Sequence, residues 1–234
     1  MPPHLAFGPQ GPTAATDAPW HDPLRRADWD VRPIAHADAR AFVEAHHYAL
    51  GMSKTAVARY GLYARACGTL AAVSVWLPPG SPAAARSFLA APDAPRRVLA
   101  LSRLVAAPWA PRYASGHLVA RSATLLPDRW DVLCTYAHEG LGHVGTVYQA
   151  VNFTYLGTTP PANFWVDAQG RMVSDRAGSR TLTRLEMLER GCVLRGKTRK
   201  HRYRFDRRDP EARNPHAYPK RHHLLFNSSP VEAE

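Results

Sequence analysis

The amino-acid sequence predicts a layered α/β domain in which a mixed β-sheet carries helices on both faces. Two observations lead to this prediction. Segments with strand periodicity alternate with segments of helical periodicity along most of the 234 residues. In addition, 45% of the residues are hydrophobic, which is enough to build a sizeable core. No apolar run reaches the roughly 20 residues that span a bilayer, so we expect a cytoplasmic protein rather than a membrane protein.

The first half of the domain is predicted to contain a strand, a helix and a hairpin. Residues 29–34 have the pattern of a short strand, and residues 37–48 repeat apolar side chains at helical spacing. A short segment ending in Gly68 separates two apolar runs, which is typical of an antiparallel hairpin. The remaining elements of this half are hairpin strands at 56–64 and 69–76, a loop rich in Pro, Ala and Ser at 78–95, and a strand at 97–105.

The second half continues the alternation of helices and strands. Gly191 directly follows an apolar helical pattern and is therefore expected to end that helix. The predicted elements are a helix at 115–126, a buried strand at 131–136, a helix at 143–151, a strand at 153–156, a helix at 181–189 and a basic strand at 200–205. Pro residues interrupt both ends of the chain. We expect a disordered arm at 1–28, the folded domain at 29–208, and a basic, Pro-containing tail at 209–234.

The charge of the chain favours a polyanionic partner. Thirty Lys and Arg residues stand against nineteen Asp and Glu residues, giving a net charge of +11. Nucleic acid is the simplest partner for such a protein, and the alternative is an ordinary protein from an Arg-rich proteome. Its 3 Cys residues are scattered and form no CxxC pair, which favours reduced thiols over a disulfide scaffold or a zinc knuckle.

The densest run of polar side chains is Tyr136–Gly157, with the sequence YAHEGLGHVGTVYQAVNFTYLG. It follows a buried strand, and α/β sheets commonly place their sites at strand ends. His138, Glu139 and His143 are residue types that bind divalent metals. Their spacing matches no standard zinc signature, so a Gly-rich turn with surface histidines is the alternative interpretation.

Three further motifs are candidates for a site. In the pair His46–His47, adjacent residues at a helix end point in different directions, so at most one imidazole should face a site. In the motif LSRL, strand alternation places Ser102 and Leu104 on one face and Arg103 on the other, where Arg103 pairs with a carboxylate or lines a pocket. In 197–208, basic and aromatic residues alternate, which suits phosphate contact or a solvated edge strand.

Taken in order, these motifs resemble the Mom family of phage DNA-modification proteins. The resemblance covers residues 30–206 and rests on AHHY, LSRL, GHVGTVYQAVNFTYLG, NFWVD and KHRY. It implies a GCN5-related acyltransferase-like fold. It also implies conversion of adenine in duplex DNA to its N-carbamoylmethyl (acetamido) derivative at the exocyclic amine, which protects DNA from host restriction. The family further implies a bound iron and a small-molecule group donor.

The resemblance also implies which residues form the site. By motif position, the catalytic set is His47, Tyr48, Arg103, Ser122, His138 and Tyr148. The iron ligands would be His47, Tyr48, His138 and Tyr148. Double-stranded DNA would be held by Lys197, Arg199, Lys200, Arg202 and Arg204. His138 departs from the family, which usually has Asp at this position, although His also ligates divalent metals and Glu139 supplies a neighbouring carboxylate.

The donor site is expected near Arg112, Ser115 and Gly116, where acyltransferases have their pyrophosphate loop. His117 occupies a small-residue position of that loop and would crowd a pyrophosphate, which argues against acetyl-coenzyme A as the donor. A flipped adenine needs stacking and edge contacts. The candidates for stacking are Tyr48, Phe164 and Trp165, and those for pairing are Asn152 and Asn163.

Two other functions remain open from the sequence alone. One is an N-acetyltransferase of the same fold that acts on a small amine or a protein. The other is a DNA-binding relative without catalytic activity, which the departure at His138 keeps open. The sequence leaves the oligomeric state undetermined between a monomer and a dimer.

Overall fold

A computed structural model describes residues 23–47, 51–89, 97–177, 180–209 and 216–219. Its main feature is a seven-stranded sheet with the order β1-β2-β3-β4-β5-β12-β6. These strands are β1 (Trp29–Pro33), β2 (Ala58–Ala64), β3 (Leu70–Leu77), β4 (Val98–Ala106), β5 (Val132–His138), β12 (Lys200–Asp206) and β6 (Thr154–Thr158). The helices are α1 (His36–His46), α2 (Pro82–Arg86), α3 (Ala114–Leu125), α4 (Thr146–Ala150) and α5 (Arg184–Glu189), with 3-10 turns η1 (Arg26–Asp28) and η2 (Glu139–Leu141).

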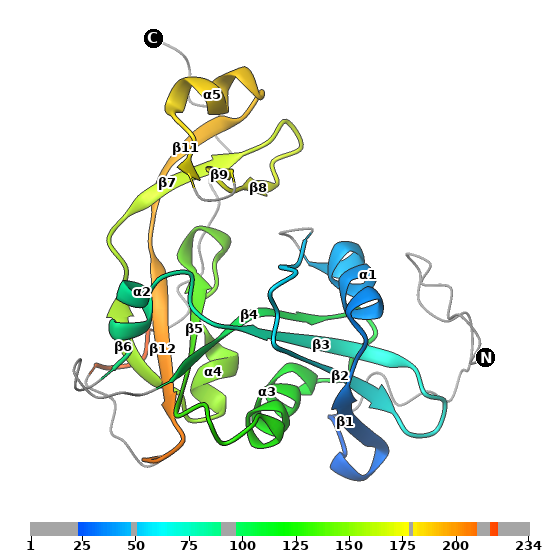
Figure 1. Cartoon of the computed structure of the whole chain (residues 1–234). Coiled ribbons are helices and arrows are strands. Elements are labelled where there is room, and N and C mark those ends of the chain that lie inside the picture. The colour runs from blue at the N-terminus through cyan, green and yellow to red at the C-terminus, as the bar shows by residue number, and fades with distance from the viewer. Residues whose placement is uncertain (1–22, 48–50, 90–96, 178–179, 210–215, 220–234) are drawn as a thin grey trace.

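The sheet splits between its two central strands. β4 and β5 are parallel and pair only from Val98↔Val132 to Leu101↔Thr135. Beyond this point β4 stays paired with β3 as far as Ala106, while β5 stays paired with β12 as far as His138. The two halves of the sheet therefore diverge, and Figure 1 shows β3 running across the molecule while β5 and β12 run in a different direction.

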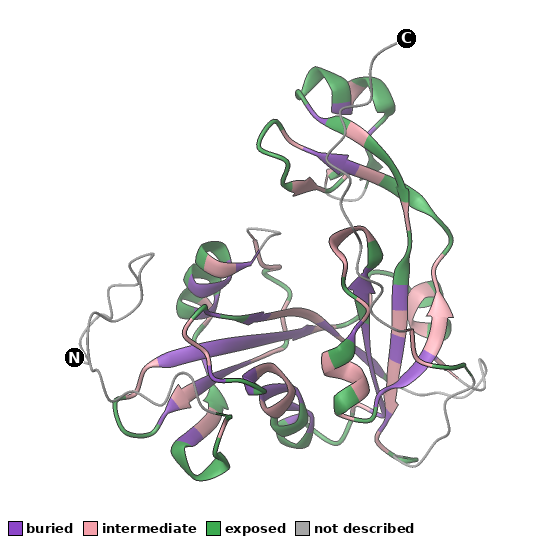
Figure 2. Ribbon diagram, turned by 180° about the vertical axis from the view of Figure 1, so that it is seen from behind, coloured by how far each residue is buried: buried purple, intermediate pink, exposed green. Residues whose placement is uncertain are grey.

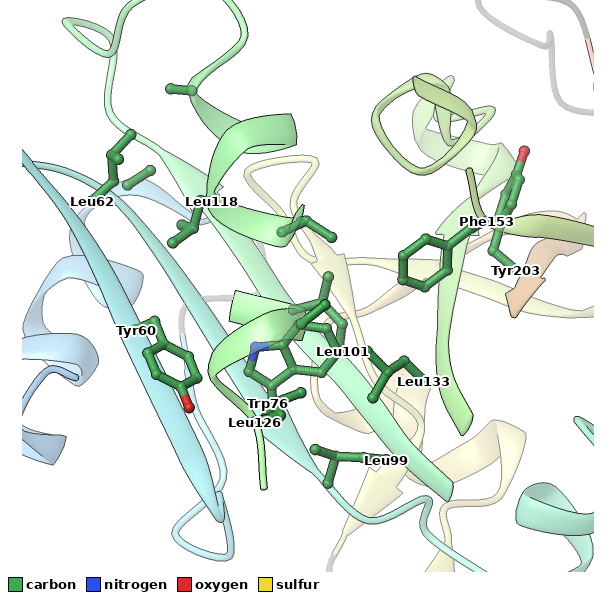
Figure 3. Close-up of a cluster of buried hydrophobic side chains, with 14 of the residues drawn as sticks. Tyr60, Leu62, Trp76, Leu99, Leu101, Leu118, Leu126, Leu133, Phe153 and Tyr203 are labelled. Carbon is green, nitrogen blue, oxygen red and sulfur yellow. The ribbon is translucent and has the colours of Figure 1, made fainter. Parts of the chain in front are cut away.

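Helices cover both faces of the sheet, as predicted. Successive strand residues point to opposite faces, so each face of β3 has its own core. On one face Leu118 of α3 packs in a cluster with Leu62 and Trp76, shown in Figure 3. On the other face Phe42 of α1 packs with Val73. Figure 2 shows the central strands largely buried, and each such large apolar side chain contributes about 1.5–3 kcal/mol on burial.

A smaller lobe projects from the main sheet (Figure 1). It contains a sheet of order β11-β7-β8, a hairpin of β9 and β10, and α5. Its core is formed by Trp165, Leu182, Met187 and Cys192. The strands are β7 (Ala162–Val166), β8 (Met172–Val173), β9 (Arg176–Ala177), β10 (Arg180–Thr181) and β11 (Val193–Thr198). The predicted helix at 181–189 is present but begins at residue 184, after Thr183 and Glu186 form a capping box.

The structure corrects two predicted elements. The loop predicted at 78–95 contains α2, whose first turn is capped by Ser81 accepting a hydrogen bond from the Ala84 amide at 3.1 Å. The helix predicted from residue 143 begins only at Thr146, because Gly145 has a φ of 73° and ends the preceding turn in the left-handed region.

Parts of both predicted flanking segments are ordered. Within the expected arm, the Leu24 amide donates to the Arg112 carbonyl at 3.0 Å, and η1 follows directly. Within the expected tail, the Tyr218 hydroxyl donates to the Phe153 carbonyl at 2.8 Å. The rest of the arm and most of the tail lie outside the described residues. In the part of the chain that the structure describes, no helix is long and apolar enough to cross a bilayer.

Candidate functional site

A pocket of about 280 Å³ lies where β4 and β5 separate. Polar side chains reach it from five different segments of the fold. These are His47 after α1, Ser102 from β4, His138 from β5, His143 from the loop after η2, and Tyr148 from α4. The split in the sheet therefore gathers residues that are up to about a hundred positions apart in sequence, and we call this space the cleft pocket.

His47 and His138 are buried and neutral at physiological pH. Burial, together with nearby cations, lowers the pKa of both imidazoles to about 4: the cation is Arg103 beside His47 and Lys200 beside His138. A neutral imidazole offers a lone pair that can accept a proton or bind a metal. The Nδ1 atom of His138 is buried and has no hydrogen-bond partner among the described residues. Such an orphaned atom is costly to bury unless a ligand or substrate engages it.

Tyr148 lies on the short helix α4, which forms one wall of the cleft pocket. Its ring packs against Phe153 and Tyr203, with ring centroids 5.9 and 5.5 Å away. Behind this wall, the Tyr203 hydroxyl donates to the Val144 carbonyl, and the Gln149 amide donates to the Tyr203 hydroxyl at 3.0 Å. Burial raises the pKa of Tyr203 to about 12, so this phenol keeps its proton and holds the wall in place.

The structure brings together three of the six predicted catalytic residues, His47, His138 and Tyr148. Tyr48 lies outside the described residues. Arg103 does not line the cleft pocket, and its Nε instead donates to the Gly51 carbonyl at 2.8 Å, which fixes the segment after α1. Ser122 is fully buried in the core, where its hydroxyl donates to the Leu118 carbonyl at 2.6 Å.

Ser122 therefore stands apart from both the cleft pocket and the larger groove described below. Its hydroxyl also lies 2.8 Å from that of Ser74 on β3, so the pair joins α3 to the sheet inside the core. This placement favours a structural role for Ser122 over the predicted catalytic one.

Sequence reasoning assigned no role to Ser102 or Tyr136, and it named His143 only as a residue type that binds divalent metals, although all three line the cleft pocket. Strand alternation did predict that Ser102 and Leu104 share a face that excludes Arg103, and both line the pocket while Arg103 does not. The alternation along the strand was therefore the feature of the sequence that indicated which way Ser102 faces. The position of the split in the sheet, which turns this face into a pocket wall, has no signature in the sequence.

A larger groove of about 1210 Å³ lies between α3 and α4. It shares Ser115, Thr146 and Val147 with the cleft pocket, so the two spaces adjoin. Of the residues predicted to hold the donor, Ser115 and Gly116 line this groove. Arg112 does not, and its guanidinium lies over the Tyr113 ring at 4.9 Å.

The residues predicted to contact DNA divide into two groups. Lys197, Arg199 and Lys200 are exposed at the junction of β11 and β12. Arg202 instead donates to the Ser87 carbonyl, and Arg204 donates to the Phe88 carbonyl at 3.5 Å. These two guanidiniums therefore attach β12 to the segment after α2 and are less available to a phosphate backbone.

The residues predicted to stack on or pair with a base also differ in availability. Trp165 is only 2% exposed and belongs to the core of the lobe, so it is not available for stacking. Phe164 is half-buried and its ring centroid lies 5.5 Å from that of His138, at the edge of the cleft pocket. Asn152 and Asn163 are both exposed.

The described residues contain no group of three His, Cys, Asp or Glu side chains close enough to hold a metal ion. The residue types that line the cleft pocket nevertheless include side chains that can ligate a divalent metal. His47 and His138 are both neutral, and the Nδ1 atom of His138 lacks a partner among the described residues. Neutral imidazoles are common ligands of iron and similar metals.

The two neutral imidazoles make the stability of the fold sensitive to acid. An unfolded His titrates near 6.5, whereas His47 and His138 titrate at about 4 when folded. Between these values the unfolded state binds more protons, so the free energy of unfolding should fall as the pH drops from about 6.5 to about 4. We expect His138→Gln to weaken this dependence, measured as urea unfolding near pH 7 and near pH 5. An identical fall in the wild type and the variant would contradict the assignment.

The fold and the cleft pocket define a layered α/β protein whose candidate site lies where its central sheet splits. Within this class, the chain belongs to the Mom protein family, which matches residues 28–222. The family predicted from the sequence motifs is thereby confirmed. No curated protein matches the sequence.

Several solved structures of N-acetyltransferases are similar to this chain. One is the ribosomal-protein-S18-alanine N-acetyltransferase from Escherichia coli, with 10% identity, a TM-score of 0.45, and coverage of 76% of this chain and 93% of that one. Another is the spermidine N-acetyltransferase from Vibrio cholerae in complex with CoA and spermine, with 8% identity, a TM-score of 0.44, and coverage of 80% and 99%.

Proposed function

We propose that this protein is a transferase that modifies the exocyclic amine of adenine in duplex DNA, giving the N-carbamoylmethyl derivative. The observation that carries the proposal is the cleft pocket, in which two neutral imidazoles and a phenol face one small space beside a larger groove. The membership in the Mom family supports the choice of DNA as the substrate. Protection of the modified DNA from restriction enzymes is the proposed biological role.

The amine of adenine is a weak nucleophile because its lone pair is delocalised into the ring. In the proposed reaction the amine nitrogen forms a bond to the methylene carbon of the donor, and the leaving group departs with its bonding electron pair. The proton lost from the amine needs an acceptor in the pocket. His47 and His138 are neutral and can take it, and the Tyr148 hydroxyl is placed to orient the amine or the donor.

In a metal-bound form of the site, a divalent metal such as iron would be held by His47, His138 and Tyr148, together with Tyr48 outside the described residues. An imidazole whose lone pair binds the metal would not also accept the amine proton, so metal binding and proton acceptance are alternative roles for each His. When bound, the metal would supply Lewis-acid polarisation of the donor. Arg103 acts as a positioning residue in this proposal. It holds the segment after α1 through its hydrogen bond to the Gly51 carbonyl, and its charge lowers the pKa of His47.

The target base has to leave the helix stack to reach the pocket, since its amine is otherwise enclosed in the duplex. The volume of about 280 Å³ is at the small end of ligand pockets and suits one base rather than a bulky substrate. Phe164 packs 5.5 Å from His138, a lining residue of the pocket, and is the candidate among the predicted stacking residues to contact a flipped base. The larger groove beside α3 is the proposed site of the donor.

The test is mass spectrometry of nucleosides from the DNA of cells that express the full chain. A new, heavier deoxyadenosine is expected, and its mass identifies the transferred group. Unmodified DNA from a folded, well-expressed protein would reject the proposal. Tight binding of acetyl-coenzyme A that DNA does not affect would then favour an N-acetyltransferase of a small amine or a protein, and DNA binding alone would favour an inactive relative.

The exposed cations at the junction of β11 and β12 should account for the contact with the DNA backbone. We expect Lys197→Gln and Arg199→Gln each to weaken binding to all duplex sequences and to reduce the slope of log affinity against log salt by about 1. Arg202→Gln is the matched control, because this guanidinium is engaged with the Ser87 carbonyl and should leave the slope unchanged. Fluorescence anisotropy with a short duplex at several salt concentrations measures all three, and equal slopes throughout would reject this surface.

A further inference from the structure

A third pocket, of about 420 Å³, lies between α3 and β1, and none of its lining residues lines the cleft pocket. β1 is the edge strand of the main sheet, and Figure 1 shows α3 on the same side of the molecule as β1. Its charged walls come from three separate segments: Arg26 in η1, Arg65 in the turn after β2, and His117 and Arg121 in α3. We call this space the cationic pocket.

The charges of the cationic pocket are unbalanced. Of the described residues, three with guanidiniums line it, against the single carboxylate of Asp30. That carboxylate lies 3.5 Å from Arg65. Among the described residues, Arg26 and Arg121 form no ion pair. Cations gathered without counter-charges repel one another and destabilise the fold, unless an anion offsets the repulsion.

The basic side chains of Arg26, His117 and Arg121 lie around one space rather than being spread over a surface. His117 and Arg121 are four residues apart on α3 and therefore lie on the same side of the helix. Burial lowers the pKa of His117, and the charges of Arg26 and Arg121 also lower it. The hydrogen bond between the Leu24 amide and the Arg112 carbonyl holds the segment before η1 against the start of α3, which brings Arg26 to the pocket.

We propose that the cationic pocket binds the phosphate group of a phosphate-bearing ligand. The planar guanidinium matches phosphate oxygens through paired hydrogen bonds, and three guanidiniums from different segments can surround one phosphate or pyrophosphate. Such a group reaches the pocket either on a small phosphorylated molecule or as part of a DNA backbone. The cationic pocket shares Arg26, His117, Ala120 and Thr124 with the larger groove, so where the ligand is the group donor this inference rests on the proposed function. Binding at the pocket is nevertheless measured without any catalysis.

The experiment measures the affinity of the full chain for pyrophosphate, ATP and a short DNA duplex by calorimetry. Arg121→Gln is the test variant, and Arg65→Gln is a second one should the first fail to fold, as judged by circular dichroism. Arg190→Gln is the matched control, because it removes the same charge from an exposed position at the end of α5, outside the cationic pocket. We expect the test variants to weaken binding at least about tenfold and the control to leave it unchanged.

The ligands distinguish the two sources of phosphate. Weaker binding of pyrophosphate or ATP in the test variants assigns the pocket to a small phosphorylated molecule. Weaker binding of the duplex alone assigns it to a backbone phosphate. The proposal is overturned if the wild type binds none of the three ligands, or if Arg121→Gln and Arg190→Gln bind them with equal affinity. These binding measurements need no modified adenine. A failure of this proposal is therefore distinguishable from a failure of the proposed function.

Discussion

Replacing Tyr148 with Phe should abolish DNA modification while leaving the fold intact. The ring would still pack against Phe153 and Tyr203, so the free energy of unfolding should change little. Only the hydroxyl at the wall of the cleft pocket is removed. A proton-transfer or orienting group in the transition state typically contributes about 100- to 10,000-fold to the rate. The yield of modified deoxyadenosine per cell, measured by mass spectrometry, should fall by that order.

Tyr60→Phe is the matched control for Tyr148→Phe. Its hydroxyl donates to the Leu125 carbonyl at 3.0 Å and is not part of the cleft pocket. Loss of this hydrogen bond should cost about 1 kcal/mol of stability and leave modification intact. Full activity of Tyr148→Phe would remove this hydroxyl from the mechanism, and equal losses in both variants would show that the effect is structural.

Replacing Gly145 with Ala should destabilise the protein by about 2–5 kcal/mol, the sum of two separate costs. The first is conformational, because Gly145 has a φ of 73°, in a region that L residues avoid. The second is steric, because an added Cβ would lie 2.4 Å from Cε2 of Tyr203, a side chain with no exposed surface. Displacement of Tyr203 would also release Val144 and Gln149, which Tyr203 holds at the wall of the cleft pocket.

Gly68→Ala separates these two costs. Gly68 has a similar φ of 69°, but a Cβ there would meet no atom within 4 Å. This control should therefore lose only about 1–2 kcal/mol, the conformational part. Urea unfolding of the two variants gives the steric contribution as their difference. Equal losses would mean that Tyr203 moves aside without cost, and the proposed support of the pocket wall would be wrong.

The main sheet was predictable because its strands are long enough to show their pattern. β3 has eight residues, seven of them buried, and its hairpin with β2 follows from two apolar runs around a turn. The lobe was not predicted as a second sheet, since β8, β9 and β10 have two residues each and show no periodicity. Its helix α5 was predictable because Gly191 marks its end.

The candidate site was predictable only in part, and chiefly through the family resemblance. The motif positions named His47, His138 and Tyr148, which the structure places around one pocket. Ser122 was named on the same basis but lies in the core, since a helical pattern does not reveal which partner a buried hydroxyl meets. Arg26 of the cationic pocket fell within the expected disordered arm, because its ordering depends on contacts with the distant residue Arg112.

The position of β12 between β5 and β6 also determines when the sheet can be completed. Within the described part of the chain, β6 pairs only with β12, yet the whole lobe is synthesised between these two strands. At about 5–20 residues per second, a ribosome would need roughly two to ten seconds to add that stretch. Throughout this interval the nascent chain exposes a β6 edge with no strand to pair it, which is a state prone to aggregation. Sheet completion therefore depends on late, long-range pairing, and chains that stop short of β12 should accumulate as insoluble fragments rather than as folded domains.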